Sequence, residues 1–211
     1  MNIGILREEK VPVDKRVPFS PSQCKQIITE FPELKIFVQS SDIRCFSDED
    51  YLKHGIPIVD SLESCDVLFG IKEVPKDKLI ANKTYLFFSH TIKKQEYNRE
   101  LLKKMIKLNI RMIDYEVLKY NDGSRILGFG RYAGIIGAYN GLLTYGLKHG
   151  LYALKPANKC LDRNEMNNYL NDVKLSNEKL LITGKGRVGS GILETIKKLN
   201  IEEVNIDDYL N

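Results

Sequence analysis

Two short apolar runs near the middle of the chain, residues 66–75 and 83–90, constrain its fold more than any other feature. Each run is too short for a helix, is rich in aliphatic and aromatic residues, and ends in turn or polar residues. This pattern is typical of a buried strand in an α/β sheet. Lys72 follows the apolar part of the first run and His90 ends the second. Ligands of open α/β sheets bind outside the carboxyl ends of the strands, so we expect both side chains to face one crevice.

Lys72 and His90 each have an ordinary structural explanation when taken alone. A lysine after a strand can be a surface charge, and a histidine after a strand can cap the next helix. Position in a fold is a weak argument for function. The presence of two proton-carrying groups after neighbouring strands nevertheless favours a functional site.

The other segments complete an α/β pattern. Short apolar runs predict further strands at residues 2–6, 35–39, 56–59 and 110–114. Helices are predicted from a capping box at Ser20, from Thr91 to Leu108, and over the glycine- and alanine-rich residues 132–150. The pair Asp122-Gly123 predicts a hairpin turn that leads to a returning strand over residues 125–129.

Composition narrows the class of protein. The chain has 211 residues, of which 43% are hydrophobic and 28% charged, as in a globular protein with one good core or two small domains. Its formal charge of +4 is scattered, and no apolar run approaches the ~20 residues of a membrane span, so we expect no nucleic-acid and no membrane partner. The four cysteines are far apart, which indicates free thiols in the cytoplasm, and we expect no metal site.

A glycine-rich loop near the end of the chain predicts a nucleotide site. Gly184, Gly186 and Gly189 form the pattern G-x-G-x-x-G between a predicted strand, residues 179–183, and a predicted helix, residues 192–199. In such loops the first glycine makes a tight turn, the second lets a pyrophosphate approach the backbone, and the third packs the helix on the strand. A loop of this composition can also bind nothing, so the flanking strand and helix carry the prediction.

Asp207 extends the nucleotide prediction. It follows Gly189 by 18 positions, after a predicted strand over residues 204–206, as does an acid that binds a ribose hydroxyl. Such an acid favours NAD because it repels the 2′-phosphate of NADP, whereas the charges of Lys185 and Arg187 leave NADP open. The predicted cofactor-binding residues are Gly184, Gly186, Arg187, Val188, Gly189 and Asp207.

Six short motifs distinguish the chain. They are IGILRE at residues 3–8, DKRVP at 14–18, GIKE at 70–73, FSHTIK at 88–93, IDYE at 113–116 and FGRYAG at 129–134. With these motifs the chain resembles the N-terminal half of the alanine dehydrogenase and saccharopine dehydrogenase superfamily, from Ile3 to Asp207. The FSHTIK run with its preceding phenylalanine and the FGRYAG run resemble the saccharopine branch, especially its lysine–2-oxoglutarate reductases.

The resemblance implies an α/β fold of two domains with the chemistry in the cleft between them. It assigns residues 1–131 to a Rossmann-like substrate domain, 132–150 to an inter-domain helix, and 151–211 to the start of a Rossmann domain that binds NAD or NADP. Members of the superfamily are longer, so we expect an incomplete nucleotide domain. Because cofactor sites bury most of their ligand, we expect the chain alone to bind NADH at best in the millimolar range.

The resemblance also implies an oxidoreductase of amino-acid metabolism, in which an amino acid and a 2-oxo acid are joined through an imine, as in lysine metabolism. Lys72 and His90 match the catalytic acid–base pair and would also contact the substrate. Arg16 matches the residue that binds a substrate carboxylate. Glu73 and Glu116 would tune the pKa values of the pair.

Two alternatives stay open at this point. The first is an alanine dehydrogenase-like enzyme, which belongs to the same superfamily. The second is from another class: an inactive remnant or an interaction module, in which an exposed sheet edge leads to self-association.

Overall fold

The computed structural model describes residues 1–175 and 177–210, and the chain divides into two compact units. The first unit is Met1–Leu127, and the second begins at Gly128. Helix α4 (Gly130–His149), which we predicted to connect two domains, is part of the second unit. Among the described residues, no helix is both long and apolar enough to cross a membrane.

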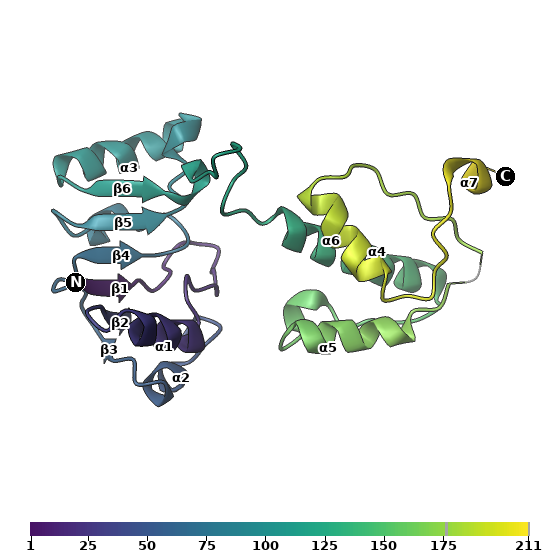
Figure 1. Cartoon of the computed structure of the whole chain (residues 1–211), viewed down its shortest axis with the longest axis horizontal. Coiled ribbons are helices and arrows are strands. Elements are labelled where there is room, and N and C mark those ends of the chain that lie inside the picture. Colours follow the sequence, from purple (N-terminus) through teal and green to yellow (C-terminus); the bar gives the residue numbers. More distant parts are fainter. Residues whose placement is uncertain (176, 211) are drawn as a thin grey trace. The chain divides into compact units, whose positions relative to one another are not determined.

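Six parallel strands form the sheet of the first unit, which confirms the predicted Rossmann-like α/β fold (Figure 1). They are β1 (Asn2–Ile5), β2 (Lys35–Gln39), β3 (Ile58–Val59), β4 (Val67–Phe69), β5 (Thr84–Phe87) and β6 (Arg111–Asp114). Their order across the sheet is β3-β2-β1-β4-β5-β6. Both apolar runs from the middle of the chain are therefore strands, β4 and β5, and they are neighbours.

The strand order reverses at β1, and this determines where a ligand can bind. β1 pairs with β2 on one side and with β4 on the other. In open sheets of this kind the connections after two such strands diverge to opposite faces, and the crevice between them is the usual position of a ligand. The segments that follow β1 and β4 are therefore the first place to look for a site.

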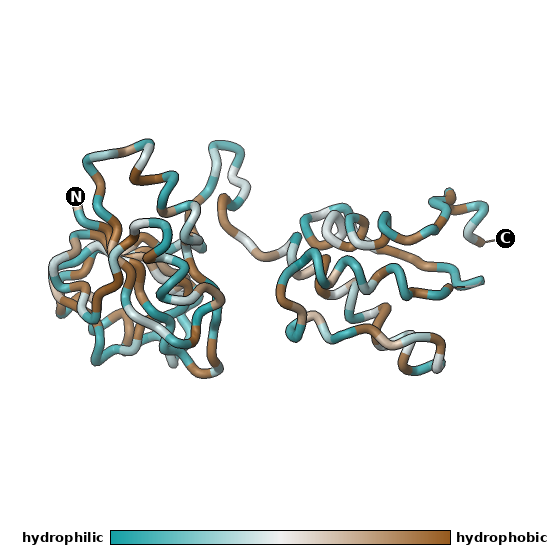
Figure 2. Tube along the Cα trace, turned by 90° about the horizontal axis from the view of Figure 1, so that it is seen from below, coloured by the Kyte–Doolittle hydropathy of each residue, from teal (hydrophilic) through white to brown (hydrophobic). Residues whose placement is uncertain are grey.

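One apolar cluster covers the face of the sheet that carries Ile3 and Ile5 of β1. Alternate residues of a strand point to opposite faces, so these two side chains share one side. The cluster also contains residues of α1 (Pro21–Glu30) and α2 (Asp48–Lys53), which cover this face. In Figure 2 hydrophobic segments gather in the interior of the first unit, and hydrophilic segments surround them.

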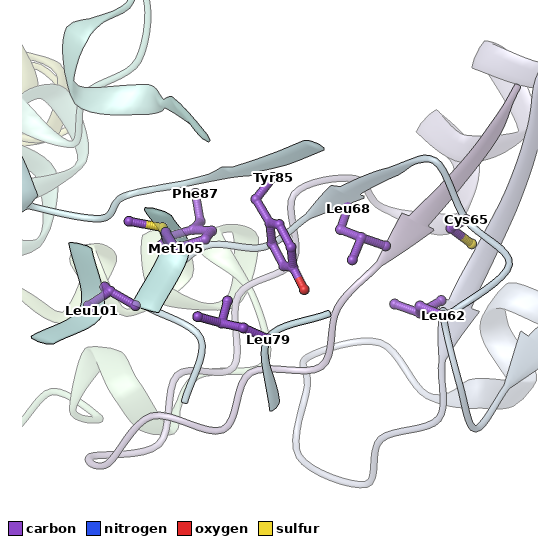
Figure 3. Close-up of a cluster of buried hydrophobic side chains, with 8 residues drawn as sticks. All are labelled: Leu62, Cys65, Leu68, Leu79, Tyr85, Phe87, Leu101 and Met105. Atoms are coloured by element: carbon purple, nitrogen blue, oxygen red, sulfur yellow. The ribbon is translucent and has the colours of Figure 1, made fainter. Parts of the chain in front are cut away.

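A second apolar cluster covers the opposite face, and Figure 3 shows its buried side chains. Tyr85 and Phe87 of β5 are fully buried and pack with Leu101 and Met105 of α3 (Glu96–Lys107). The hydroxyl oxygen of Tyr85 also accepts a hydrogen bond from a backbone amide, which satisfies this polar atom inside the core. The sheet is thus covered by helices on both faces, as parallel sheets require.

Capping boxes fix the starts of the helices on the first face. Ser20 accepts a hydrogen bond from the amide of Gln23, and the Gln23 side chain accepts one from the amide of Ser20. Ser47 and Asp50 form the same reciprocal pair at α2. Both boxes satisfy amides that have no partner within the helix. The predicted start at Ser20 is confirmed.

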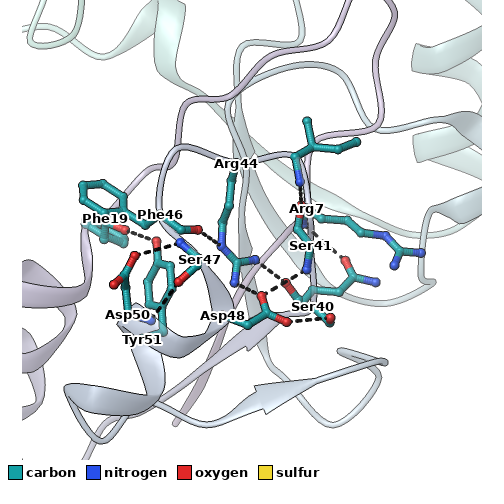
Figure 4. A network of polar contacts seen from close by, with 12 residues as sticks. Arg7, Phe19, Ser40, Ser41, Arg44, Phe46, Ser47, Asp48, Asp50 and Tyr51 are labelled. Carbon is teal, nitrogen blue, oxygen red and sulfur yellow. Dashed lines mark hydrogen bonds and ion pairs between the residues drawn. The ribbon is translucent and has the colours of Figure 1, made fainter. Parts of the chain in front are cut away.

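A polar network closes the loop between β2 and α2 (Figure 4). The side chain of Arg44 is only 5% exposed and forms an ion pair with Asp48. Its guanidinium also donates to the carbonyl oxygens of Gln39 at 2.7 Å and Phe46 at 2.9 Å. The hydroxyl of Ser40 donates to the Asp48 carboxylate at 2.7 Å. The buried charge of Arg44 is stable because all three nitrogens of its guanidinium have a hydrogen-bond acceptor.

The helix predicted from Thr91 begins later than expected. Residues Thr91–Lys93 form the 3-10 helix η2, and α3 begins only at Glu96. Lys94 adopts a φ of 54°, which interrupts a right-handed helix. The apolar periodicity therefore predicted α3 correctly, but the first turn of the predicted helix is not part of α3.

The returning strand predicted over residues 125–129 does not form. The turn itself is present, with a φ of 80° at Gly123. Only one antiparallel bridge follows, between Lys119 and Arg125. A strand needs a partner strand, and the segment before the turn is instead the 3-10 helix η3 (Tyr115–Val117).

The second unit is helical in its described part. It contains α4, α5 (Arg163–Asn168), α6 (Arg187–Ile196) and α7 (Ile206–Leu210). The remaining 3-10 helices of the chain are η1 (Lys76–Lys78), η4 (Ala157–Lys159) and η5 (Tyr169–Asp172). Helix α6 begins five residues earlier than predicted, directly after Gly186.

The two strands predicted for the second unit are wrong. Residues 179–183 and 204–206 form no strand, and Ile206 already begins α7. A strand is held by hydrogen bonds to a neighbour, and the described residues of this unit provide no neighbouring strand. In the segment 204–206 the side chain of Asn205 accepts a hydrogen bond from the amide of Asp208 at 3.0 Å, which favours the start of a helix. Residues 180–183 instead border an apolar cavity of about 440 Å³, together with residues of α4 and α6.

Glycines allow α4 and α6 to pack against each other. A Cβ atom on Gly134 would lie 2.0 Å from the carbonyl oxygen of Val188, and one on Gly191 would lie 2.0 Å from the carbonyl oxygen of Arg131. Both distances are far below any real contact, so the helices approach to a separation that only glycine permits. The close contact thus explains the glycines at positions 134 and 191.

We expect Gly134→Ala to destabilise the second unit by about 1–3 kcal/mol, because the added methyl group overpacks the helix contact. Gly137→Ala in the same helix is the matched control, since its Cβ would meet nothing within 4 Å. That substitution should stabilise the helix by up to about 1 kcal/mol, because alanine has the higher helix propensity. Urea unfolding followed by circular dichroism measures both variants. Equal effects of the two substitutions would contradict the close packing.

Candidate active site

The carboxylate of Glu8 joins the segments that follow β1 and β4. It accepts the amide hydrogens of Ile71 at 2.6 Å and Lys72 at 2.9 Å. Glu8 is only 9% exposed. The main chain of Lys72 is therefore fixed by an acid from the neighbouring strand, at the position where the strand order reverses.

Burial dominates the electrostatics of Glu8. Loss of solvent raises the pKa of this carboxyl above its ordinary value, although the two backbone hydrogen bonds act in the opposite direction. The nearby Tyr115 is also buried, and burial together with the charge of Glu8 raises the pKa of its hydroxyl. Glu8 thus retains its proton to a higher pH than an exposed glutamate.

Asp14 holds Arg16 in a fixed orientation. The Arg16 guanidinium donates to the Asp14 carboxylate from Nε at 2.8 and 3.1 Å and from Nη2 at 2.5 Å. These bonds lower the pKa of Asp14, and the positive charge of Lys72 lowers it further. Arg16 and Lys72 therefore act on the same carboxylate, and any substrate carboxylate must share Arg16 with Asp14.

His90 lies after β5 and pairs with Glu116, which lies after β6. The His90 Nδ1 atom is 3.1 Å from Oε2 of Glu116, and the histidine side chain is 20% exposed. Lys93 and Arg125 approach the other oxygen of Glu116 at 3.4 and 3.3 Å. The backbone of His90 has a φ of 57°, which is rare for a residue with a side chain.

The contacts of His90 Nδ1 determine which ring nitrogen carries the proton. Lys93 Nζ also lies 3.2 Å from Nδ1, but an ammonium group can only donate, whereas a carboxylate can only accept. Nδ1 cannot satisfy both at once. We assign the Nδ1 proton to the bond with Glu116, because the carboxylate is the shorter contact and Lys93 has its own ion pair with Glu116. Neutral His90 then has a lone pair on Nε2 and can accept a proton there.

The charges around Glu116 outweigh its burial. Burial alone would raise its pKa, but hydrogen bonds from His90 and Lys93 and their charges lower it below the ordinary value. Glu116 therefore remains ionised and orients the imidazole. This agrees with the tuning role that we predicted for it, although the role itself stays a prediction.

The Glu73 carboxylate forms an ion pair with Lys10. Among the described residues it has no hydrogen bond to Lys72 or His90, and its tuning of their pKa values stays a prediction. Its Oε1 atom is buried and has no hydrogen-bond partner among the described residues. A buried acceptor without a donor is costly.

Lys72 and His90 come from adjacent segments of the main chain. The amide of Phe88 donates to the carbonyl oxygen of Ile71 at 3.0 Å, so the pairing of β4 with β5 continues to the residues beside the predicted acid–base pair. The sequence prediction of a common sheet edge is therefore confirmed for the backbone. The catalytic roles of the two side chains stay predictions.

The predicted phosphate loop forms a tight glycine turn at the start of α6. Gly184 has a φ of 91°, Gly186 caps α6, and a Cβ on Gly189 would lie 2.2 Å from the carbonyl oxygen of Gly184. Arg187 and Val188 lie in the first turn of α6. The described residues form the helix of the predicted pattern but not the strand before the loop, and binding of a dinucleotide stays a prediction.

Asp207 does not lie where the ribose prediction placed it. It is in the first turn of α7 and not at the end of a strand. The strand that was to carry it needs a neighbour that the described residues do not supply. The structural basis of this prediction is therefore wrong.

Sequence reasoning missed Glu8 and Asp14 as members of the site. Glu8 lies at the same offset after β1 as Lys72 does after β4, so its position after a central strand was an available signal. Its bonds to backbone amides leave no pattern in the sequence. Arg131 of the FGRYAG motif is paired with Glu194 within the second unit.

The pKa values of Glu8 and Glu116 predict opposite trends of stability with pH. An acid with a raised folded-state pKa binds more protons when folded, so the stability it contributes falls as pH rises from its ordinary 4.5 through the raised value. An acid with a lowered pKa contributes stability above 4.5 and loses it as pH falls through the lowered value.

We therefore expect the stability of the unaltered chain relative to Glu8→Gln to decrease with rising pH, and its stability relative to Glu116→Gln to increase. Urea unfolding at a series of pH values measures both differences. Trends of the same sign for the two variants would contradict the opposite environments of these carboxyls.

Comparison with known proteins places this fold and these residues in a family. Residues 4–136 match the family model of the alanine dehydrogenase/PNT N-terminal domain. An L-alanine dehydrogenase structure superposes with a TM-score of 0.57 at 20% identity, over 73% of this chain and 44% of that chain, which supports the fold alone.

Curated relatives extend the comparison. The chain is 38% identical over 146 residues to the mitochondrial alpha-aminoadipic semialdehyde synthase of Mus musculus, which covers 69% of this chain and 16% of that protein. It is 31% identical to the saccharopine dehydrogenase [NAD(+), L-lysine-forming] of Candida glabrata, over 95% of this chain and 58% of that enzyme. The chain thus spans less than two thirds of these relatives. Its match to the family model covers most of the first unit and the start of α4, and the chain belongs to the alanine dehydrogenase/PNT N-terminal domain family.

Proposed function

We propose that the chain is the substrate-binding part of an NAD(P)-dependent oxidoreductase that acts on a CH–NH bond, of the saccharopine dehydrogenase type. The observation that carries this proposal is the set of groups after the central strands. Lys72 and His90 can carry protons, Arg16 can bind a carboxylate, and all three lie on segments that follow the carboxyl ends of β1, β4 and β5. One of the curated relatives named above is by name an NAD(+)-dependent, L-lysine-forming saccharopine dehydrogenase, which supports the same class.

The reaction joins an amine and a 2-oxo acid. The amine nitrogen adds to the 2-oxo carbon, the nitrogen loses a proton and the former carbonyl oxygen gains one, which gives a carbinolamine. The carbinolamine hydroxyl takes up a second proton and leaves as water, so that a protonated imine remains. Addition of hydride to the carbon of the protonated imine gives the secondary amine. Bound NADH would supply that hydride, and the oxidative direction reverses each step.

His90 and Lys72 supply the proton transfers in this proposal. Because Glu116 holds the proton on Nδ1, His90 accepts the amine proton at Nε2. The Lys72 ammonium donates a proton to the leaving hydroxyl. Groups in this role contribute about 10²–10⁴-fold to the rate.

Arg16 binds the 2-oxo acid in this proposal. The planar guanidinium of Arg16, oriented by Asp14, suits the carboxylate of the 2-oxo acid. This assignment matches a 2-oxo acid as one of the two small-molecule partners.

An alanine dehydrogenase-like reaction is the second candidate, favoured by the family model and by the superposed structure. The two reactions differ in their nitrogen source. Ammonia and pyruvate serve the second candidate, whereas an amino acid such as lysine and a 2-oxo acid such as 2-oxoglutarate serve the first.

An interaction module is the candidate from another class. The favouring observation is the apolar cavity lined by residues of α4, of α6 and by residues 180–183, among them Leu181, which is 70% exposed. A face of this kind can bind a second copy of the chain. Sedimentation that shows a dimer, without any binding of substrate or cofactor, would support this candidate.

We expect the 211-residue chain to bind NADH no more tightly than the millimolar range, a binding free energy of about −4 kcal/mol. The described part of the second unit provides the loop from Gly184 to Gly189 but no strand beside it, whereas cofactor sites bury roughly 70–90% of their ligand. Calorimetric titration measures this affinity. Micromolar binding would show that another copy or segment completes the site.

The catalytic assignment is tested in a longer protein that joins this chain to a complete nucleotide domain. We expect loss of NADH with lysine and 2-oxoglutarate, and a decrease in kcat/KM of about 10²–10⁴-fold for Lys72→Gln and for His90→Gln. Arg16→Lys keeps the charge but loses the planar fork, so KM for the 2-oxo acid should rise about tenfold. Lys76→Gln, an exposed change, is the control and should have no effect.

Turnover with pyruvate and ammonia alone would overturn the saccharopine-type assignment in favour of the alanine dehydrogenase type. Unchanged activity of Lys72→Gln and His90→Gln would overturn the assignment of the acid–base pair.

A further inference from the structure

The backbone of His90 requires a local constraint. Its φ of 57° and ψ of 8° place it in the left-handed region, which is unfavourable for a residue with a side chain. Such a conformation persists only where the surrounding structure imposes it. The neighbours of His90 in the chain therefore contribute to holding its side chain beside Glu116.

Ser89 provides this constraint through a fully satisfied hydroxyl. Ser89 is 0% exposed, and its hydroxyl donates its one hydrogen to Oδ2 of Asp114. The amide of Thr91 donates to the Ser89 oxygen at 3.1 Å. The Thr91 hydroxyl lies 2.8 Å from the same oxygen, and it must be the donor because the Ser89 hydrogen is already used. The hydroxyl of Ser89, on one side of His90, is thus bound both to Asp114 and to Thr91 on the other side.

Asp114 connects this turn to the turn that carries Glu116. Its Oδ1 atom accepts the amide of Glu116 at 2.8 Å and caps η3, while its Oδ2 atom accepts the Ser89 hydroxyl. Asp114 ends β6 and is 7% exposed. One buried carboxylate therefore fixes the main chain next to both members of the His90–Glu116 pair.

We propose that Ser89 and Asp114 are positioning residues that set the distance between His90 and Glu116 and thereby select the His90 tautomer with its proton on Nδ1. Neither residue touches the substrate in this proposal. The proposal rests on the proposed function in one respect, since the selected tautomer is the one that accepts a proton at Nε2. The tautomer itself is a property of the chain without substrate.

A merely structural role would have a different consequence. If Ser89 and Asp114 only stabilise the sheet edge, their loss lowers stability and leaves the imidazole of every folded molecule unchanged. If they position the pair, their loss lengthens the contact between Nδ1 and Glu116, so that the proton on Nδ1 loses its acceptor.

The experiment is nitrogen NMR of the His90 ring in the 211-residue chain, above about pH 8, where an ordinary imidazole is neutral. The signal is assigned by its absence in His90→Gln. In the unaltered chain we expect the Nδ1–H tautomer as the major form. In Ser89→Ala and Asp114→Asn we expect loss of this preference, as in Glu116→Gln, which removes the acceptor directly.

Tyr85→Phe is the matched control for stability. It removes another buried hydroxyl of the same unit. This hydroxyl accepts a hydrogen bond from the amide of Ile80 at 2.8 Å. It should lower stability without any change in the His90 signal. Where Ser89→Ala does not fold, Thr91→Val removes only the outer hydroxyl and should give a smaller change in the same direction.

Folded Ser89→Ala, Asp114→Asn or Thr91→Val chains with the tautomer of the unaltered protein would overturn the positioning role. This outcome leaves the proposed reaction untouched, because the acid–base assignment depends on Lys72→Gln and His90→Gln in the turnover assay. Conversely, a failed turnover assay leaves the tautomer result valid.

Discussion

The pairing of β1 with β4, clamped by Glu8, is the constraint on which the candidate site depends. Two amides at the end of β4 would otherwise have no acceptor, and the Glu8 carboxylate satisfies both. Hydrogen bonds to an ionised group contribute about 1.5–3 kcal/mol each, yet burying a carboxylate costs several kcal/mol. The raised pKa of Glu8 shows that burial prevails. Glu8 thus fixes the backbone of Ile71 and Lys72, and at pH values above its raised pKa its burial lowers the stability of the fold.

The fold of the first unit could be predicted from the sequence because its strands are defined by local apolar runs. A parallel sheet places the carboxyl ends of its strands at one edge, so the neighbourhood of Lys72 and His90 followed from their positions alone. The partners of these residues could not be predicted in the same way. Glu8 and Asp114 bind backbone amides and a hydroxyl across the sheet, and contacts of that kind depend on which strands become neighbours.

The second unit shows the opposite case, in which a local pattern was misleading. Residues 179–183 have the composition of a strand, but strands are stabilised by hydrogen bonds to other strands and not by composition. The helical contact between α4 and α6 needs only two elements and small residues at Gly134 and Gly191, so it forms within the described residues. The loop at Gly184 directly precedes α6, and its backbone depends on glycine and on the helix start rather than on a sheet.

The two predicted proton carriers are held by the same kind of device. Glu8 accepts a hydrogen bond from the backbone amide of Lys72 itself. Asp114 accepts one from the hydroxyl of Ser89, which precedes His90, and one from the amide of Glu116, which pairs with His90. Glu8 lies shortly after β1, which is next to β4, and Asp114 ends β6, which is next to β5. Both devices act on the main chain or on a neighbouring residue, and neither uses the proton-carrying atoms. A site built in this way can orient a lysine and a histidine without consuming the groups that must exchange protons with a substrate.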